Sequence, residues 1–87
     1  MTMEFRMKVA DLFRAGTKTV FTGEVHTQAK VIKNASCVIE IDGVSAGELY
    51  IEGEVNTGRP YHDLWTTSPV NLTREVVLSH DVWLISS

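Results

Sequence analysis

Residues 5–25 read FRMKVADLFRAGTKTVFTGEV, and this stretch decides the fold class. Apolar and polar residues alternate along its first half, which is typical of a β-strand with one buried face. A turn at residues 14–17 leads into a second strand over residues 18–27, which is rich in Thr, Val and Phe. Gly23 lies inside this second strand, where a glycine marks a bulge or a close approach of two backbones. The residues predicted to share one face of the first strand are Phe5, Met7, Val9, Asp11 and Phe13.

The rest of the chain continues the pattern of short strands separated by turns. Asp42-Gly43 is a tight-turn pair between two of these strands. Along the strand that follows, apolar residues alternate with Glu48, Glu52 and Glu54, which are expected on one solvated face. No stretch of ten residues carries a helical apolar stripe. The further strands are predicted over residues 36–42, 47–55, 70–78 and 82–85.

These observations predict one all-β domain spanning residues 1–87. Its expected architecture is a small antiparallel β-barrel of about six to seven strands. A chain of 87 residues has room for one domain only. Closure into a barrel is favoured because it removes exposed strand edges.

The charge is moderate in total and uneven along the chain. Eight basic and 11 acidic residues give a net charge of −3 at pH 7, which argues against a stand-alone nucleic-acid binder. Residues 1–33 hold six basic and three acidic side chains, whereas residues 34–87 hold two basic and eight acidic ones. This division predicts either a basic patch that meets a partner or ordinary charge pairs between neighbouring strands.

Cys37 is the single cysteine, so no disulfide can form within the chain. Its apolar neighbours predict that the thiol is buried. The first residues contain no continuous apolar segment of the kind found in signal peptides, and no apolar run approaches the ~20 residues of a membrane helix. The expectation is a cytoplasmic protein without a membrane partner.

A family resemblance covers residues 5–41. The stretches FRMKVADLF at 5–13 and GTKTVFTGEV at 16–25 resemble the start of domain 2, the translation-protein β-barrel, of elongation factor Tu-like translational GTPases. The segments VIK at 31–33 and VIEI at 38–41 resemble that family's next pair of strands. The resemblance implies a barrel that contacts a GTPase domain, RNA or the ribosome. The chain has no phosphate-binding loop of the form GxxxxGK(S/T), so it is not itself a GTPase.

A loop-rich segment at residues 56–69 carries the candidate binding residues Arg59, Tyr61, His62 and Trp65. Arginine, tyrosine and tryptophan are enriched at the hot spots of protein interfaces. Loops on a rigid scaffold also tend to carry function. The alternative is that Tyr61 and Trp65 plug one end of the barrel.

Two short segments echo each other, HDLW at 62–65 and HDVW at 80–83. If the pairs His62-Asp63 and His80-Asp81 converged in space, they could act as metal ligands or as an acid–base pair. The alternative is that each His-Asp forms a turn before a strand. The three glutamates of residues 47–55 are a further candidate for a hard cation. Neither pattern has the spacing of a specific motif, so no catalytic residue, metal ligand or cofactor is assigned.

Two classes of function follow from these features. The leading hypothesis is a free-standing, non-catalytic β-barrel module that binds a protein or ribonucleoprotein partner, or associates with itself as a homo-oligomer. The second is a small-ligand or metal-binding protein, or an enzyme, that uses the two His-Asp pairs. The two hypotheses differ in geometry, because the second requires those side chains to meet around a pocket. RNA or the ribosome as a partner follows from the resemblance alone.

Overall fold

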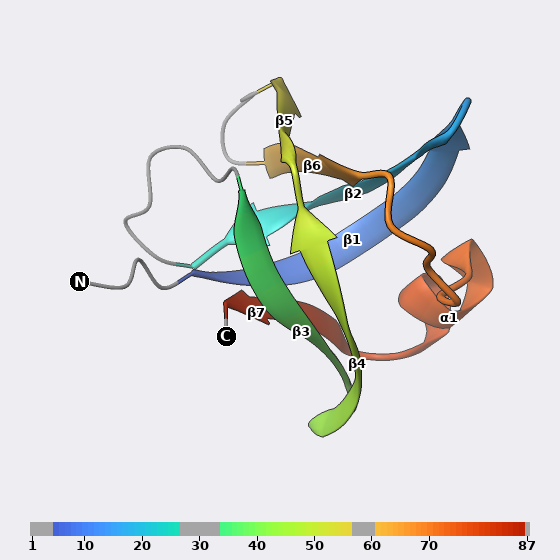
Figure 1. Ribbon diagram of the computed structural model, residues 1–87. Helices are drawn as coiled ribbons and strands as arrows, with labels where there is room; N and C mark the ends of the chain where they lie inside the picture. Colours follow the sequence, from blue (N-terminus) through green and yellow to red (C-terminus); the bar gives the residue numbers. More distant parts are fainter. Residues whose placement is uncertain (1–4, 27–33, 57–60, 87) are drawn as a thin grey trace.

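The computed structural model describes residues 5–26, 34–56 and 61–86, which form one antiparallel sheet and a short helix (Figure 1). The strand order in the sheet is β4-β3-β7-β1-β2-β6-β5. The prediction of a small all-β fold is confirmed. In chain order, the elements are β1 (Arg6–Ala15), β2 (Lys18–Val25), β3 (Ala35–Ile41), β4 (Val44–Ile51), β5 (Gly53–Asn56), β6 (Tyr61–Thr66), α1 (Arg74–Ser79) and β7 (Val82–Ser86).

The sheet is not closed into a barrel by a continuous ladder of hydrogen bonds, so the expected closure is not what the chain achieves. Its two edge strands, β4 and β5, are successive parts of one extended stretch that is interrupted at Glu52. β5 pairs with β6 along its length, and two further hydrogen bonds join the preceding residues, Tyr50 and Glu52, to β6. Glu52 N donates to Trp65 O at 3.0 Å, and the buried Thr66 Oγ1 donates to Tyr50 O at 2.6 Å. Before Tyr50, β4 pairs with β3 alone among the described strands, which leaves part of the edge open.

β1 contains a bulge, and after it the alternation of buried and exposed side chains is shifted by one residue. Its pairing register with β2 shifts between Val9 and Asp11, which makes Ala10 an extra residue. After the bulge Leu12 is 3% exposed, whereas Phe13 is 47% exposed. The prediction that Asp11 and Phe13 belong to the buried face is wrong, because one inserted residue turns every later side chain to the other face.

Gly23 of β2 lies opposite Val9, at the edge of this bulge. A Cβ atom on Gly23 would lie 2.9 Å from the carbonyl carbon of Lys8 and closer still to the carbonyl oxygen. The two backbones approach so closely that only glycine fits. The prediction made for this glycine is confirmed.

A second exchange of faces occurs at Glu52, between β4 and β5. The pairing of β5 with β6 sets Glu54 opposite the buried Leu64. Glu54 therefore points to the core side, where its side chain is only 4% exposed. Strict alternation predicts that it shares a solvated face with Glu48, and that prediction is wrong.

The segment predicted as a strand over residues 70–78 instead contains the helix α1. Thr73 is its N-cap, and the Thr73 hydroxyl accepts a hydrogen bond from Val76 N at 3.2 Å. Glu75 in the first turn suits the positive end of the helix dipole. Val76 and Val77 favour a strand by propensity, but propensity is weak beside a local cap and the burial of Val77.

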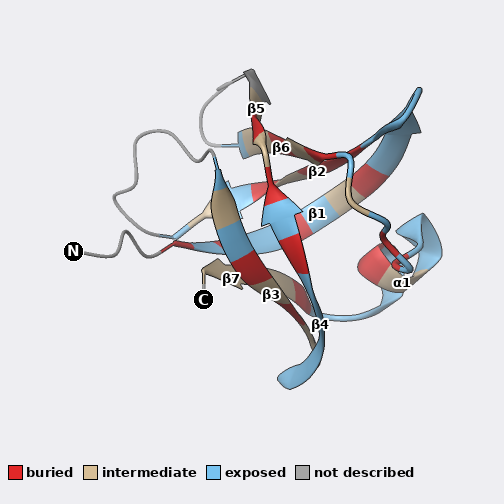
Figure 2. Ribbon diagram, in the orientation of Figure 1, coloured by how far each residue is buried: buried red, intermediate tan, exposed pale blue. Residues whose placement is uncertain are grey.

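The hydrophobic core lies on one side of the curled sheet and is covered at one end by α1 and the preceding segment (Figures 1 and 2). α1 contributes Val77, and residues 70–72 contribute Val70 and Leu72. Burial of each large apolar side chain stabilises the fold by about 1.5–3 kcal/mol. The largest fully buried side chains are Phe5, Met7, Phe21, Ile51, Leu64 and Leu84.

Candidate functional site

The face of the sheet opposite the core carries a cluster around Trp83 of β7. The guanidinium carbon of Arg6 lies 4.9 Å from the centre of the indole ring, and Lys8 Nζ lies 5.7 Å from it. Both cations are within the range of an attractive cation–π contact. His26, which follows β2, meets the same ring in a T-shaped contact with 5.2 Å between ring centres. Arg6, Lys8, His26 and Trp83 are called the Trp83 cluster below.

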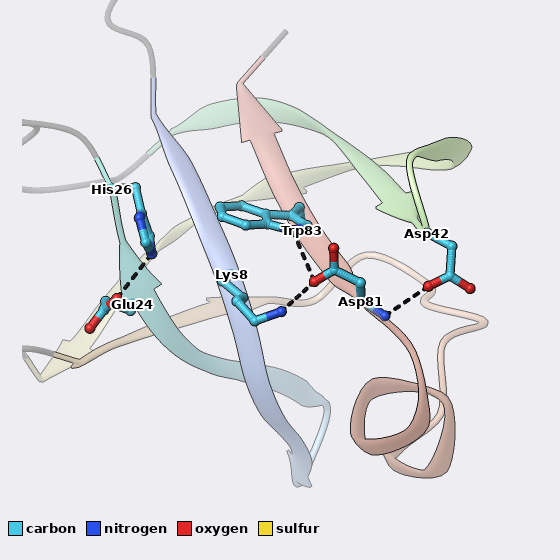
Figure 3. Close-up of polar contacts among 6 residues, drawn as sticks. All are labelled: Lys8, Glu24, His26, Asp42, Asp81 and Trp83. Atoms are coloured by element: carbon cyan, nitrogen blue, oxygen red, sulfur yellow. Dashed lines mark hydrogen bonds and ion pairs between the residues drawn. The ribbon is translucent and has the colours of Figure 1, made fainter.

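Carboxylates hold the Trp83 cluster in place (Figure 3). Lys8 Nζ forms an ion pair with Asp81, and Trp83 Nε1 donates to the same carboxylate at 3.2 Å. His26 Nε2 lies 3.0 Å from the carboxylate of Glu24. The hydrogen bond from Lys8, followed by that from Trp83, lowers the pKa of Asp81. The arrangement is therefore an aromatic ring contacted by two cations from β1, with the carboxylates of Asp81 and Glu24 paired to members of the cluster.

Asp42 fixes the turn that leads into β7 and so helps to position Trp83. Asp42 adopts a left-handed conformation with φ +52° in the turn between β3 and β4. Its carboxylate accepts a hydrogen bond from Asp81 N at 3.0 Å, and its own N–H donates to Asp81 O at 2.8 Å. His80 Nδ1 lies 2.7 Å from the other carboxylate oxygen. The Asp81 N–H, followed by His80, lowers the pKa of Asp42.

The candidate binding residues Tyr61, His62 and Trp65 lie on a strand, β6, so their side chains alternate between two faces. Tyr61 points outward and is 49% exposed. Trp65 also points outward, and Lys18 Nζ lies 4.3 Å from its ring centre. His62 has the same parity as the buried Leu64 and points to the core side. Arg59 lies outside the described residues.

Each histidine of the two His-Asp segments pairs with a carboxylate other than that of the neighbouring aspartate. His62 Nδ1 lies 3.2 Å from a Glu54 carboxylate oxygen, and the two side chains are 17% and 4% exposed. Asp63 accepts a hydrogen bond from Thr22 at 2.8 Å on the opposite face. His80 pairs with Asp42, as described above.

The two histidines also lie far apart. His62 is on β6 and His80 precedes β7, with β2 and β1 between these strands. Three strand spacings amount to about 14 Å. The side chains therefore do not meet around one pocket in the way that the enzyme hypothesis requires.

The glutamates at positions 48, 52 and 54 do not form a common cation site. Glu48 is exposed on β4, and Glu54 faces His62 on the core side. Glu52 instead accepts hydrogen bonds from the backbone and hydroxyl of Thr67. Within residues 5–26, 34–56 and 61–86, no group of three or more His, Cys, Asp or Glu side chains is placed to hold a metal ion.

Cys37 is buried, as its neighbours predicted, and burial raises the pKa of its thiol from the ordinary 9.0 to about 12. The folded protein should therefore react slowly with iodoacetamide at pH 8 and rapidly in denaturant. The thiol of the unfolded chain ionises near pH 9, whereas the buried thiol stays neutral up to about pH 12. Raising the pH over this range therefore favours the unfolded chain, and the stability that is fully present below pH 9 is lost. The free energy of unfolding should fall less steeply over that range in Cys37→Ala than in the wild type. If the free energy of unfolding, measured by chemical denaturation at each pH, falls equally steeply in both proteins, the raised pKa of Cys37 is contradicted.

No family model, curated protein or solved structure matches this chain. The resemblance of residues 5–41 to domain 2 of translational GTPases therefore stays a prediction. In the part of the chain that the structure describes, no helix has the length and hydropathy of a membrane span.

The Trp83 cluster was missed at the level of sequence, although its residues are all visible there. Lys8 and Asp81 are separated by 73 positions and meet because β1 pairs with β7. No local pattern shows that pairing. The one available signal was the alternation of Arg6 and Lys8 with buried residues on the first strand, which predicts that both point outward.

Proposed function

We propose that the chain is a non-catalytic module that binds a partner protein through the outward face of β1, β2, β6 and β7. The observation that carries the proposal is the Trp83 cluster, an indole ring contacted by Arg6 and Lys8 on a sheet face that lacks any covering layer in the described chain. Tryptophan and arginine are the residue types that dominate binding energy at protein interfaces.

The same face includes Tyr61 and Trp65, two of the residues predicted from the sequence to bind a partner. Tyr61 lies in register with Glu24 of β2, which is in register with Lys8 of β1, and Lys8 is in register with Trp83. Tyr61 and Trp83 are therefore three strand spacings apart, about 14 Å. One interface of standard size, about 800 Å² on each partner, spans that distance.

Charge favours a protein over a nucleic acid as the partner. A nucleic-acid interface needs an excess of basic groups to neutralise phosphates. The outward face of the described strands has no such excess. Its charged residues on the described strands include the cations Arg6, Lys8 and Lys18 and the acids Asp11, Glu24, Glu40 and Asp63.

The test compares two tyrosines of similar exposure, one on a strand of the proposed face and one on β4, which is not part of that face. Tyr61 on the proposed face is 49% exposed, and Tyr50 on β4 is 41% exposed. We expect Tyr61→Ala and Trp83→Ala each to weaken partner capture from native lysate about tenfold or more, as hot-spot residues do. Tyr50→Ala should capture the partner as the wild type does. Mass spectrometry of the eluates, with and without ribonuclease, measures the outcome.

Thermal unfolding of each variant separates loss of binding from loss of folding. If Tyr50→Ala loses the partner as strongly as Tyr61→Ala, the proposed face is wrong. Capture that disappears with ribonuclease would mean that RNA, and not a protein surface, is recognised.

The proposal places the module in the cytoplasm, since its single cysteine is a buried free thiol.

A further inference from the structure

A groove opens where β4 is not covered by another strand. Residues 46–48 of β4 form one wall and residues 69–72 form the other, and the apolar side chains that line it include Ile39 and Leu72. Its volume is about 160 Å³. These two segments belong to β4 and to the stretch that leads from β6 to α1, whose course can be followed in Figure 1. Because Ile39 belongs to the core side of the sheet, the groove lies on the opposite side from Trp83.

The part of β4 beside the groove has the properties of an edge that accepts a further strand. Residues 44–48 are all exposed, and Val44 is 67% exposed. They include neither lysine nor proline, the residues that commonly block a strand edge, and Glu48 is their one charged member. An open edge offers unpaired backbone N–H and C=O groups to an extended peptide.

A bulge at Ala46 decides which kind of occupant fits. The register with β3 sets Gly47 opposite Ile39 and Ser45 opposite Glu40, so Ala46 is an extra residue. A bulge bends the strand and hinders edge-to-edge pairing between folded sheets. A second copy of the chain would also have to bring its whole sheet edge between two walls. A single extended peptide can follow the bend and enter the groove.

We infer that this groove binds an extended peptide of a partner protein, which pairs with β4 and places one apolar side chain in the hollow. A cavity of about 150 Å³ accepts a benzene molecule, so a leucine or phenylalanine side chain suits the observed volume. Among the described residues that line the groove, Glu48 is the one that is charged. Basic residues next to the apolar one are therefore favoured by charge complementarity.

The probe is the synthetic heptapeptide KTKLKTK, in which leucine points to one side of the extended chain and its flanking lysines to the other. Titration into the isotope-labelled protein should give saturable amide shifts along residues 44–49 in NMR spectra. We expect KTKSKTK, which lacks the apolar side chain, and ETELETE, which reverses the charge, each to bind about tenfold more weakly or worse. KTPLPTK should also bind weakly because its prolines remove two backbone donors.

Two substitutions on adjacent residues test the groove itself. Ala46→Leu fills the hollow and is expected to weaken binding of KTKLKTK about tenfold. Ser45→Leu adds the same side chain at an exposed neighbour that does not line the groove, and should leave binding unchanged. Glu48→Lys replaces an exposed charged residue with one of opposite charge, and this variant should bind ETELETE more tightly than KTKLKTK. It keeps the inference testable if Ala46→Leu fails to fold.

Several results would overturn the inference. Equal binding of KTKLKTK and KTKSKTK would reduce the effect to charge attraction, and full binding to folded Ala46→Leu would exclude the groove. A dimer in sedimentation that Ala46→Leu dissociates would make a second copy the occupant. Trp83→Ala should leave peptide binding unchanged, so this test is independent of the proposed function.

Discussion

Replacing Gly23 with alanine is expected to destabilise the fold by about 3 kcal/mol, at the upper end of the usual range for an overpacked site. The added Cβ would lie 2.9 Å from the carbonyl carbon of Lys8, on the backbone of the neighbouring strand. No side-chain rotation relieves such a contact, so β1 and β2 would have to separate. Urea unfolding followed by tryptophan fluorescence measures the change in the free energy of unfolding.

Gly16→Ala is the matched control for Gly23→Ala. Gly16 has φ +65°, and a Cβ placed on it meets nothing within 4 Å. Its replacement should cost about 1 kcal/mol, from the left-handed backbone conformation alone. If both alanines cost the same, the close approach of the two strands at Gly23 is not what requires a glycine there.

The second large effect is expected from the neighbouring residues Leu12 and Phe13, which the bulge at Ala10 places on opposite faces. Leu12 is 3% exposed in the core, and Leu12→Ala should cost about 3 kcal/mol of stability. Phe13 is 47% exposed, and Phe13→Ala should change stability by less than about 0.5 kcal/mol. The same denaturation experiment measures both variants.

The pair Leu12→Ala and Phe13→Ala tests the register of the central strands directly. Without the bulge, strict alternation from Val9 puts Phe13 in the core and Leu12 outside. A larger loss from Phe13→Ala than from Leu12→Ala would therefore mean that β1 runs without an extra residue. It would also remove the outward position assigned to Asp11.

Local chemistry in the sequence was enough to predict most of the strands and two special backbone positions. Alternation located β1 and β2, and Asp42-Gly43 marked the turn before β4. The closed barrel and the loop expected over residues 61–66, which is β6, were wrong, and the other errors arose at single residues. Ala10 and Glu52 each shift the phase of a strand by one, and Thr73 starts a helix in a segment rich in valine. An inserted residue leaves the composition of a strand unchanged, so its effect on facing is invisible until the partner strand is known.

Short-range alternation and backbone geometry were enough to predict three features from the order of the amino acids, namely an all-β fold, the buried thiol of Cys37 and a close backbone approach at Gly23. The partners of the polar side chains, by contrast, became visible only in the folded chain. His62 pairs with Glu54 rather than Asp63, and Trp83 meets Lys8 from the other end of the chain. These contacts depend on the pairing of strands distant in sequence, and that pairing is set by the burial of a shared core, not by the residues that happen to meet on either face.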